Sequence, residues 1–222
     1  MASLKIITTS DGSHSLLDED LQETYHSVHG AIQESNHVFI QSGLQYLLDV
    51  KHSHSATVLE IGFGTGLNAW LTMAFARAHE VSIRYVTIEA FPLDESIWSK
   101  LNYAEPPMRG EFFRMHQADW EKDVELHPEF HLRKIHGKLE DISIDEAAYD
   151  VIFYDAFAPS KQAEMWSLPM LEKSVNGLKA GGVFVTYCAK GQLKRDLRSL
   201  NLSTATLPGP PGKKEMVRAT KN

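Results

Sequence analysis

Apolar residues follow two different spacings along this chain, and segments with one spacing alternate with segments of the other. Short apolar runs predict buried strands at 56–61, 81–88, 132–135, 149–154 and 183–188, of which 132–135 is the weakest. Apolar residues at helical spacing predict helices between them at 67–78, 94–100, 165–176 and 192–200, and an antiparallel hairpin is expected at 202–206 and 216–220. Strands that alternate with helices predict a Rossmann-like α/β sheet with helices on both faces.

The N-terminal quarter of the chain has a weaker pattern. It is rich in Ser, His and Gln, with one strand expected at 4–8 and an amphipathic helix at 40–50. We therefore expect residues 1–55 to form a small N-terminal extension that packs on the cofactor side of a main domain, residues 56–222.

Composition narrows the class of protein. A chain of 222 residues that is 43% hydrophobic can bury a full core as one domain. The single cysteine, Cys188, excludes an internal disulfide and favours a reducing, cytoplasmic location. Residues 1–17 lack the apolar core of a signal peptide, and no apolar run reaches bilayer length, so no membrane partner is expected. The eleven histidines are scattered without completing a tetrahedral set, and no metal is expected.

The net charge of −7 is unevenly distributed. From Cys188 to the C-terminus, eight Lys and Arg residues face two acidic residues, so this segment carries +6 and residues 1–187 carry −13. Such asymmetry is typical of a local phosphate-binding face on an acidic protein, and equally of a solvated helix followed by a charged tail.

The segment 57–68 contains a glycine-rich loop between an expected strand and an expected helix. Gly62 allows a sharp turn, and Gly64 and Gly66 leave room for a ligand against the backbone. The helix that follows directs its N-terminal amides at that ligand. The G-x-G-x-G spacing after an acid differs from the G-x-G-x-x-G of dinucleotide sites and favours S-adenosylmethionine (SAM). The expected contacts of this loop are Glu60, Gly62, Phe63, Gly64, Thr65, Gly66 and Asn68.

Acidic residues end three of the expected strands, and each has its own expected role. Glu89, 23 residues after Gly66, stands where a carboxylate accepts hydrogen bonds from both ribose hydroxyls. Glu60 is expected to orient the loop or to meet the ligand's ammonium through water. Asp155 is expected to bind the acceptor, because an acid at this strand end can hold an amine with its lone pair toward the donated methyl and then take its proton.

Aromatic residues follow Asp155. Phe157 and Pro159 come next in the segment, and Trp166 and Tyr187 complete a possible stacking wall for a base. A position in the core is as plausible for Trp166.

Two motifs together resemble one family. Glu60-Ile-Gly-Phe-Gly-Thr-Gly-Leu-Asn68 and Asp155-Ala-Phe-Ala-Pro-Ser-Lys161 are similar to those of the MnmC-type methyltransferase that completes 5-methylaminomethyl-(2-thio)uridine at the tRNA wobble position, in its stand-alone MnmD form. Segments 23–39 and 208–218 also resemble the ends of that family.

The resemblance implies a fold, a cofactor and a substrate. The fold is the seven-stranded sheet of SAM-dependent methyltransferases, SAM is the donor, and the amine of 5-aminomethyluridine in the tRNA anticodon loop is the acceptor. It also implies Asp155 as the catalytic residue and places Gln33 and Ser35 near the methionine end of SAM. Lys138 stands where an acid commonly meets the adenine amino group, although a lysine ammonium cannot accept a hydrogen bond. Either a neighbouring acid, Glu140 or Asp141, or the backbone would then hold the adenine.

The acceptor site is expected to combine the aromatic segment with the basic C-terminal region. Its expected residues are Phe157, Pro159, Trp166, Lys190, Lys194, Arg195, Lys213 and Lys214. Two alternatives stay open: an aminopropyltransferase that uses decarboxylated SAM, and a catalytically inactive methyltransferase-like binding module.

Overall fold

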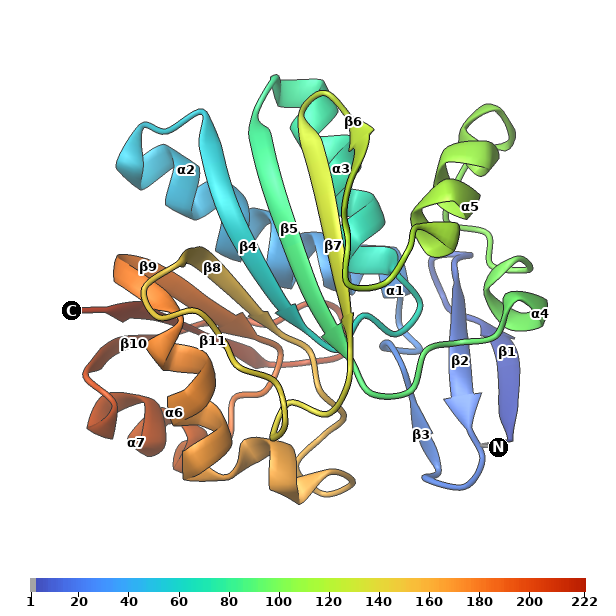
Figure 1. Cartoon of the computed structure of the whole chain (residues 1–222). Helices are drawn as coiled ribbons and strands as arrows, with labels where there is room; N and C mark the ends of the chain where they lie inside the picture. The colour runs from blue at the N-terminus through green and yellow to red at the C-terminus, as the bar shows by residue number, and fades with distance from the viewer. Residues whose placement is uncertain (1–2) are drawn as a thin grey trace.

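The computed structural model describes residues 3–222 and contains two β-sheets (Figure 1). The larger sheet has eight strands in the order β10-β11-β9-β8-β4-β5-β7-β6, and the smaller has the order β1-β2-β3. The strands of the large sheet are β4 (Ser55–Ile61), β5 (Ser82–Glu89), β6 (Asp123–His127), β7 (Phe130–His136), β8 (Tyr149–Tyr154), β9 (Leu178–Thr186), β10 (Leu202–Pro208) and β11 (Glu215–Lys221). The small sheet comprises β1 (Leu4–Thr8), β2 (His14–Asp18) and β3 (Glu23–Thr24).

The centre of the large sheet is parallel. Strands β9, β8, β4, β5 and β7 pair in parallel, and the hairpin β10–β11 adds to β9 in the antiparallel direction. The predicted α/β fold and closing hairpin are therefore confirmed. The predicted count of seven strands is wrong, because β6 pairs antiparallel with β7 as an eighth, edge strand. Its sequence, Asp-Val-Glu-Leu-His, is mostly polar and only partly buried, so it lacks the apolar run that identified the central strands.

Helices cover both faces of this sheet. The helices of the described residues are α1 (Ala31–Ser35), η1 (Asn36–Gln45, of π type), α2 (Tyr46–Lys51), α3 (Leu67–His79), α4 (Glu95–Trp98), η2 (Pro106–Met108), α5 (Arg109–Gln117), η3 (Ala163–Trp166), α6 (Leu168–Asn176) and α7 (Gly191–Ser199), of which α4 lies beside the small sheet (Figure 1). One core joins α3 and the α1–η1–α2 helix to Val58 and Phe153, and the other joins α6 and α7 to Leu59 and Tyr154. Neighbouring strand residues thus face opposite layers, as the two-residue period requires.

The N-terminal segment divides into two parts. Strands β1, β2 and β3 form the small sheet, which lies beside the large one (Figure 1). The helix expected at 40–50 begins earlier, at Ala31, and packs directly on the large sheet, with the rings of Phe39 and Phe153 5.2 Å apart. Gly43 allows this close packing, because a Cβ atom there would lie 2.8 Å from Val185.

Three further observations concern residues 3–222. None of the helices there is both long and apolar enough to cross a membrane. Within the same residues, no three or more His, Cys, Asp or Glu side chains are grouped so that they could hold a metal ion. Cys188 is free and buried, and burial raises the pKa of its thiol.

Candidate active site

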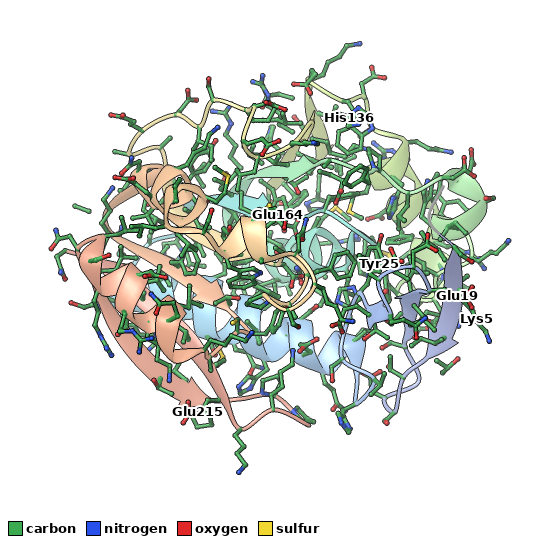
Figure 2. The ribbon with its side chains drawn as sticks, turned by 90° about the horizontal axis from the view of Figure 1, so that it is seen from below. Lys5, Glu19, Tyr25, His136, Glu164 and Glu215 are labelled. Carbon is green, nitrogen blue, oxygen red and sulfur yellow. The ribbon has the colours of Figure 1, made fainter. Side chains whose placement is uncertain are left out.

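A cavity of about 660 Å³ lies at the carboxyl ends of the parallel strands. Its walls come from the segments that follow β4, β5, β7 and β8, and from residues 23–29 of the N-terminal segment. Figure 2 looks onto this end of the sheet, and the labelled Tyr25 and Glu164, which both line the cavity, lie near the middle of the view. The position is where open α/β sheets bind ligands, and the volume is that of a small-molecule site.

The glycine loop forms one wall of the cavity. Gly62, Gly64 and Gly66 have φ angles of +94°, +49° and +73°, in the left-handed region that favours glycine. A Cβ atom on Gly62 would lie 2.9 Å from the carbonyl oxygen of Asp155, so the loop packs against the end of β8. Gly66, which precedes α3, was predicted to contact the cofactor but is not among the residues that line the cavity, and a Cβ atom there would lie 2.8 Å from the His116 ring.

Two histidines hold Thr65 at the centre of the loop. The His26 Nε2 lies 2.7 Å from the Thr65 hydroxyl, and the His116 Nε2 lies 3.2 Å from the Thr65 carbonyl oxygen, to which it donates. Burial lowers the pKa of His26 to about 4 and that of His116 to about 3, so both rings are neutral at pH 7. The sequence analysis did not find this role, because neither histidine belongs to a local motif.

Glu89 ends β5 beside the loop. One carboxylate oxygen accepts a 2.9 Å hydrogen bond from the Gly64 amide, and the other accepts a 2.8 Å bond from the Phe91 amide. A carboxylate offers about four acceptor positions, so Glu89 retains capacity for further hydroxyl donors. It lines the cavity next to Gly62 and Gly64.

Asp155 follows β8 and lines the cavity. Its Oδ2 accepts a 2.8 Å hydrogen bond from the Asn68 amide on α3. Desolvation raises the pKa of Asp155 to about 7, with a further rise from Glu34, while Asn68 and Lys213 act in the opposite direction. A carboxyl group that titrates near neutrality can both accept and release a proton under working conditions.

Two residues predicted to contact the cofactor lie behind the cavity wall. Asn68 is buried, and its amide group binds Asp155. Glu60 is fully buried between the sheet and α3, near Thr87, Asn68 and Tyr85, and desolvation raises its pKa well above its ordinary value. Neither residue is among those that line the cavity.

The helix that begins at Ala31 directs a different residue into the cavity from the two that were predicted. Gln33 is exposed on its outer side and Ser35 is completely buried, and neither lines the cavity. The side chain of Glu34, between them, does line it. Because successive helical residues point about 100° apart, the three cannot share one face.

Lys138 lines the cavity together with Gly137, Leu139 and Glu140. Its ammonium lies 3.6 Å from the Glu140 carboxylate, and both side chains are more than half exposed. The Gly137 amide donates to the Glu89 carbonyl, which places this segment beside the end of β5. Both options for an adenine contact, an acid and the backbone, are therefore present at this wall.

The predicted aromatic wall is divided between two cavities. Phe157 and Tyr187 line the main cavity, where Phe157 meets Tyr25 edge to face at 5.0 Å. Trp166 is buried, donates to the Phe157 carbonyl at 2.7 Å, and lines a separate cavity of about 180 Å³ with Pro159 and Lys190. Trp166 thus supports the Phe157 segment from behind.

The predicted basic residues are also separated. Lys213 lies inside the main cavity and binds Glu34. Lys194 pairs with Glu215, and Arg195 donates to Gln192 on the surface of α7. Lys190 and Lys214 are exposed.

Comparison with known proteins identifies the family. A sequence profile described as S-adenosyl-L-methionine-dependent methyltransferase matches residues 108–222. The "tRNA 5-methylaminomethyl-2-thiouridine biosynthesis bifunctional protein MnmC" of Pseudomonas putida F1 is 28% identical over 211 residues, which cover 84% of this chain and 30% of the relative. The protein of the same name from Leptospira borgpetersenii JB197 is 28% identical over 215 residues, with coverages of 90% and 32%. The chain thus spans about a third of the length of these curated relatives.

A solved structure shares the fold. The crystal structure of MNMC2 from Aquifex aeolicus matches with a TM-score of 0.82 and 22% sequence identity, over 99% of this chain and 70% of that one. The profile match extends over more than half of the chain and includes β8 and Asp155. Gly62 and Gly64 line the cavity without a side chain to obstruct a donor, and Glu89 keeps acceptor capacity beside them. The chain therefore belongs to the S-adenosyl-L-methionine-dependent methyltransferase family, with S-adenosylmethionine as its methyl donor.

Proposed function

We propose that this chain methylates the primary amine of 5-aminomethyl-(2-thio)uridine at the tRNA wobble position. The names of the curated relatives support this acceptor, and the chain aligns with about a third of their length. We therefore assign the methyl-transfer step to it, with the tRNA anticodon loop as its partner and the cytoplasm as its location.

The position of Asp155 carries the proposal. The residue stands where the glycine loop, the end of β8 and the Phe157 segment meet, and it lines the cavity that all three share. An amine bound there would lie between the donor side and the aromatic side. This is the arrangement that in-line transfer to nitrogen requires.

The chemistry assigns a separate task to each group. SAM supplies a methyl group already activated by a sulfonium. The amine must be neutral, with its lone pair toward that methyl, so that the new C–N bond forms as the C–S bond breaks. The Asp155 carboxylate accepts an N–H hydrogen bond, which orients the lone pair, and it takes the released proton. Asn68 fixes the carboxylate from behind, and the Phe157 ring offers a face for the uracil.

The cofactor contacts follow from the same walls. We propose that Gly62, Phe63, Gly64 and Thr65 frame the amino-acid end of SAM, and that Glu89 accepts the ribose hydroxyls. Segment 137–140 would hold the adenine. Residues 1–55 would act as an extension over the cofactor side, since residues 23–29 line the cavity.

We also propose that tRNA docks on the basic surface of α7 and the closing loop. The exposed side chains available for phosphate contacts are Lys190, Arg195 and Lys214. Lys190 and Arg195 follow β9, and Lys214 lies between β10 and β11 next to Lys213, which lines the cavity.

Transfer to defined tRNA tests the function. Purified protein is incubated with SAM and tRNA that carries 5-aminomethyluridine, and nucleosides are quantified by mass spectrometry. We expect conversion to 5-methylaminomethyluridine, and no conversion with tRNA that carries unmodified uridine. SAM binding by calorimetry without any conversion would refute the proposed acceptor and leave the family assignment intact.

One observation keeps the aminopropyltransferase alternative worth testing. Several acids line the cavity, namely Glu23, Glu34, Glu89, Glu140, Asp155 and Glu164, and a polyamine site requires such acids. The family profile and the curated relatives favour the methyltransferase. Decarboxylated SAM with putrescine or spermidine in the same assay should therefore give no product.

A further inference from the structure

A lysine from the far end of the chain lies inside the cavity. Lys213 belongs to the loop between β10 and β11, and its Nζ lies 2.5 Å from Oε1 of Glu34 on α1. The same Nζ is 3.7 Å from the centre of the Tyr187 ring. Both partners line the cavity, as does Lys213 itself.

The surroundings fix this ion pair. Glu34 is only 5% exposed, and its second oxygen accepts a 2.7 Å hydrogen bond from the Ser27 amide. The Tyr187 hydroxyl donates to the Ala156 carbonyl, next to Asp155. The loop itself lies against the N-terminal segment, since a Cβ atom on Gly212 would overlap the His29 ring. Lys213 is therefore held by contacts with Glu34 and Tyr187, with its side chain 31% exposed.

The pair lies within the electrostatic environment of Asp155. The groups that face Asp155 are Asn68 on α3, Glu34 on α1, Lys213 on the closing loop, Glu60 on β4, and the hydroxyls of Tyr85 on β5 and Tyr187 after β9. The charged groups that shift the pKa of Asp155 are Glu34 and Lys213. Beyond desolvation, Glu34 raises the pKa of Asp155 and Lys213 lowers it.

We propose that Lys213 is a positioning residue of the acceptor site, whose ammonium neutralises Glu34 and so keeps the Asp155 carboxylate available for the acceptor amine. Two uncompensated carboxylates in one cavity would share a proton, because like charges disfavour full ionisation of both. The paired Glu34 removes that competition. The inference rests on the proposed function in one respect, namely that the acceptor is an amine.

Direct titration of Asp155 tests the proposal without any acceptor. The ¹³C signal of the Asp155 carboxyl carbon is assigned by its absence in Asp155→Asn and followed by NMR from pH 4 to pH 9. Lys213→Met removes the charge while keeping much of the side-chain length, and we expect the Asp155 midpoint to rise by about one pH unit or more. Lys214→Met, at the exposed neighbouring position, is the matched control and should leave the midpoint in place.

The Glu34 variants separate charge from structure. In Glu34→Gln the Lys213 charge is uncompensated, so the Asp155 midpoint should fall below that of the unmodified protein. In Glu34→Gln combined with Lys213→Met, both charges are absent and the midpoint should return toward its original value. A purely structural tie between the loop and α1 would give shifts of the same sign in both single variants, or none.

The outcomes are distinct. An unchanged Asp155 midpoint in both Lys213→Met and Glu34→Gln would overturn the proposal, and Glu34→Gln alone decides if Lys213→Met does not fold. Midpoints that shift as expected in a protein that fails to methylate 5-aminomethyluridine would support the role of Lys213 and refute the proposed acceptor instead. Where transfer is observed, the acid limb of its pH–rate profile should move with the NMR midpoint.

Discussion

Replacing Asp155 with asparagine tests the centre of the proposed mechanism. The substitution keeps the shape of the side chain, and the new amide oxygen can still accept the hydrogen bond from Asn68. It removes the negative charge and the capacity to take a proton. We expect the rate of methyl transfer to fall by about 100-fold or more, which is the lower range of general-base contributions. SAM affinity should change much less, because the proposed mechanism assigns Asp155 to the acceptor and not to SAM.

The same residue predicts the pH dependence of the reaction. Its pKa of about 7 means that the carboxylate dominates above neutrality, and that only about one tenth of the molecules carry it at pH 6. The kcat/KM should therefore fall about tenfold for each unit below pH 7. In Asp155→Asn this fall of kcat/KM near pH 7 should be absent, whereas any pH dependence that comes from protonation of the amine itself should remain.

The stability of the folded protein should depend on pH in the opposite direction to kcat/KM. The pKa of Asp155 is higher in the folded protein, about 7, than its ordinary value of 3.8. The unfolded chain therefore releases this proton first, and stability falls as the pH rises from about 4 to about 7, after which this contribution is constant. A difference of about three pKa units between the folded and unfolded protein lowers the free energy of unfolding by at most about 4 kcal/mol. Asp155→Asn should consequently be at least as stable as the unmodified protein at pH 8.

Three measurements check this reasoning. Single-turnover transfer of labelled methyl groups gives the rate, calorimetry gives SAM affinity, and urea unfolding at pH 5 and pH 8 gives the stability difference. The reasoning is refuted if Asp155→Asn retains its rate within threefold, or if the acid limb near pH 7 persists in it. An Asp155→Asn protein that is less stable than the unmodified protein at pH 8 would show that the carboxylate is not strained by burial.

Three further predictions concern the cofactor and tRNA sites. Gly64→Val places a branched side chain at φ +49°, with its Cβ 3.2 Å from the Tyr25 ring, and should abolish the SAM binding that calorimetry measures. Gly110→Ala, which adds a Cβ in open space, is the control and should bind SAM normally. Normal SAM binding by Gly64→Val would refute the assignment of this loop to the cofactor. His116→Leu removes the donor to the Thr65 carbonyl and should weaken SAM binding by about fivefold in the same assay, and unchanged affinity would exclude a bracing role. The double variant Lys214→Glu, Arg195→Glu should weaken tRNA binding in filter assays. The slope of the logarithm of the binding constant against the logarithm of the salt concentration should fall by about one unit for each lost phosphate contact. An unaltered slope would show that these residues do not contact tRNA.

The sequence by itself determined the central sheet and the order of the main site elements. Apolar runs mark buried parallel strands, and glycines at alternate positions mark a loop that needs left-handed backbone, which Gly62, Gly64 and Gly66 all adopt. Acids at the ends of strands must meet at one edge of a parallel sheet, so the positions of Glu89 and Asp155 at the cavity follow from local pattern and topology. The partly buried edge strand β6 lacks such a pattern, which is why the strand count was wrong.

Only the tertiary structure decided which neighbouring side chain faces the cavity and which distant residues meet there. The rotation of one helix selects Glu34 over Gln33 and Ser35, and no residue-level pattern in this segment specifies that rotation. Lys213 reaches Glu34 across 179 positions in the chain, and His116 reaches Thr65 across 51. Such contacts depend on how the closing loop and α5 pack against the rest of the molecule. Sequence periodicity reports only the side of an element that is buried, whereas charge pairing and hydrogen bonding within the site depend on which elements the fold brings together.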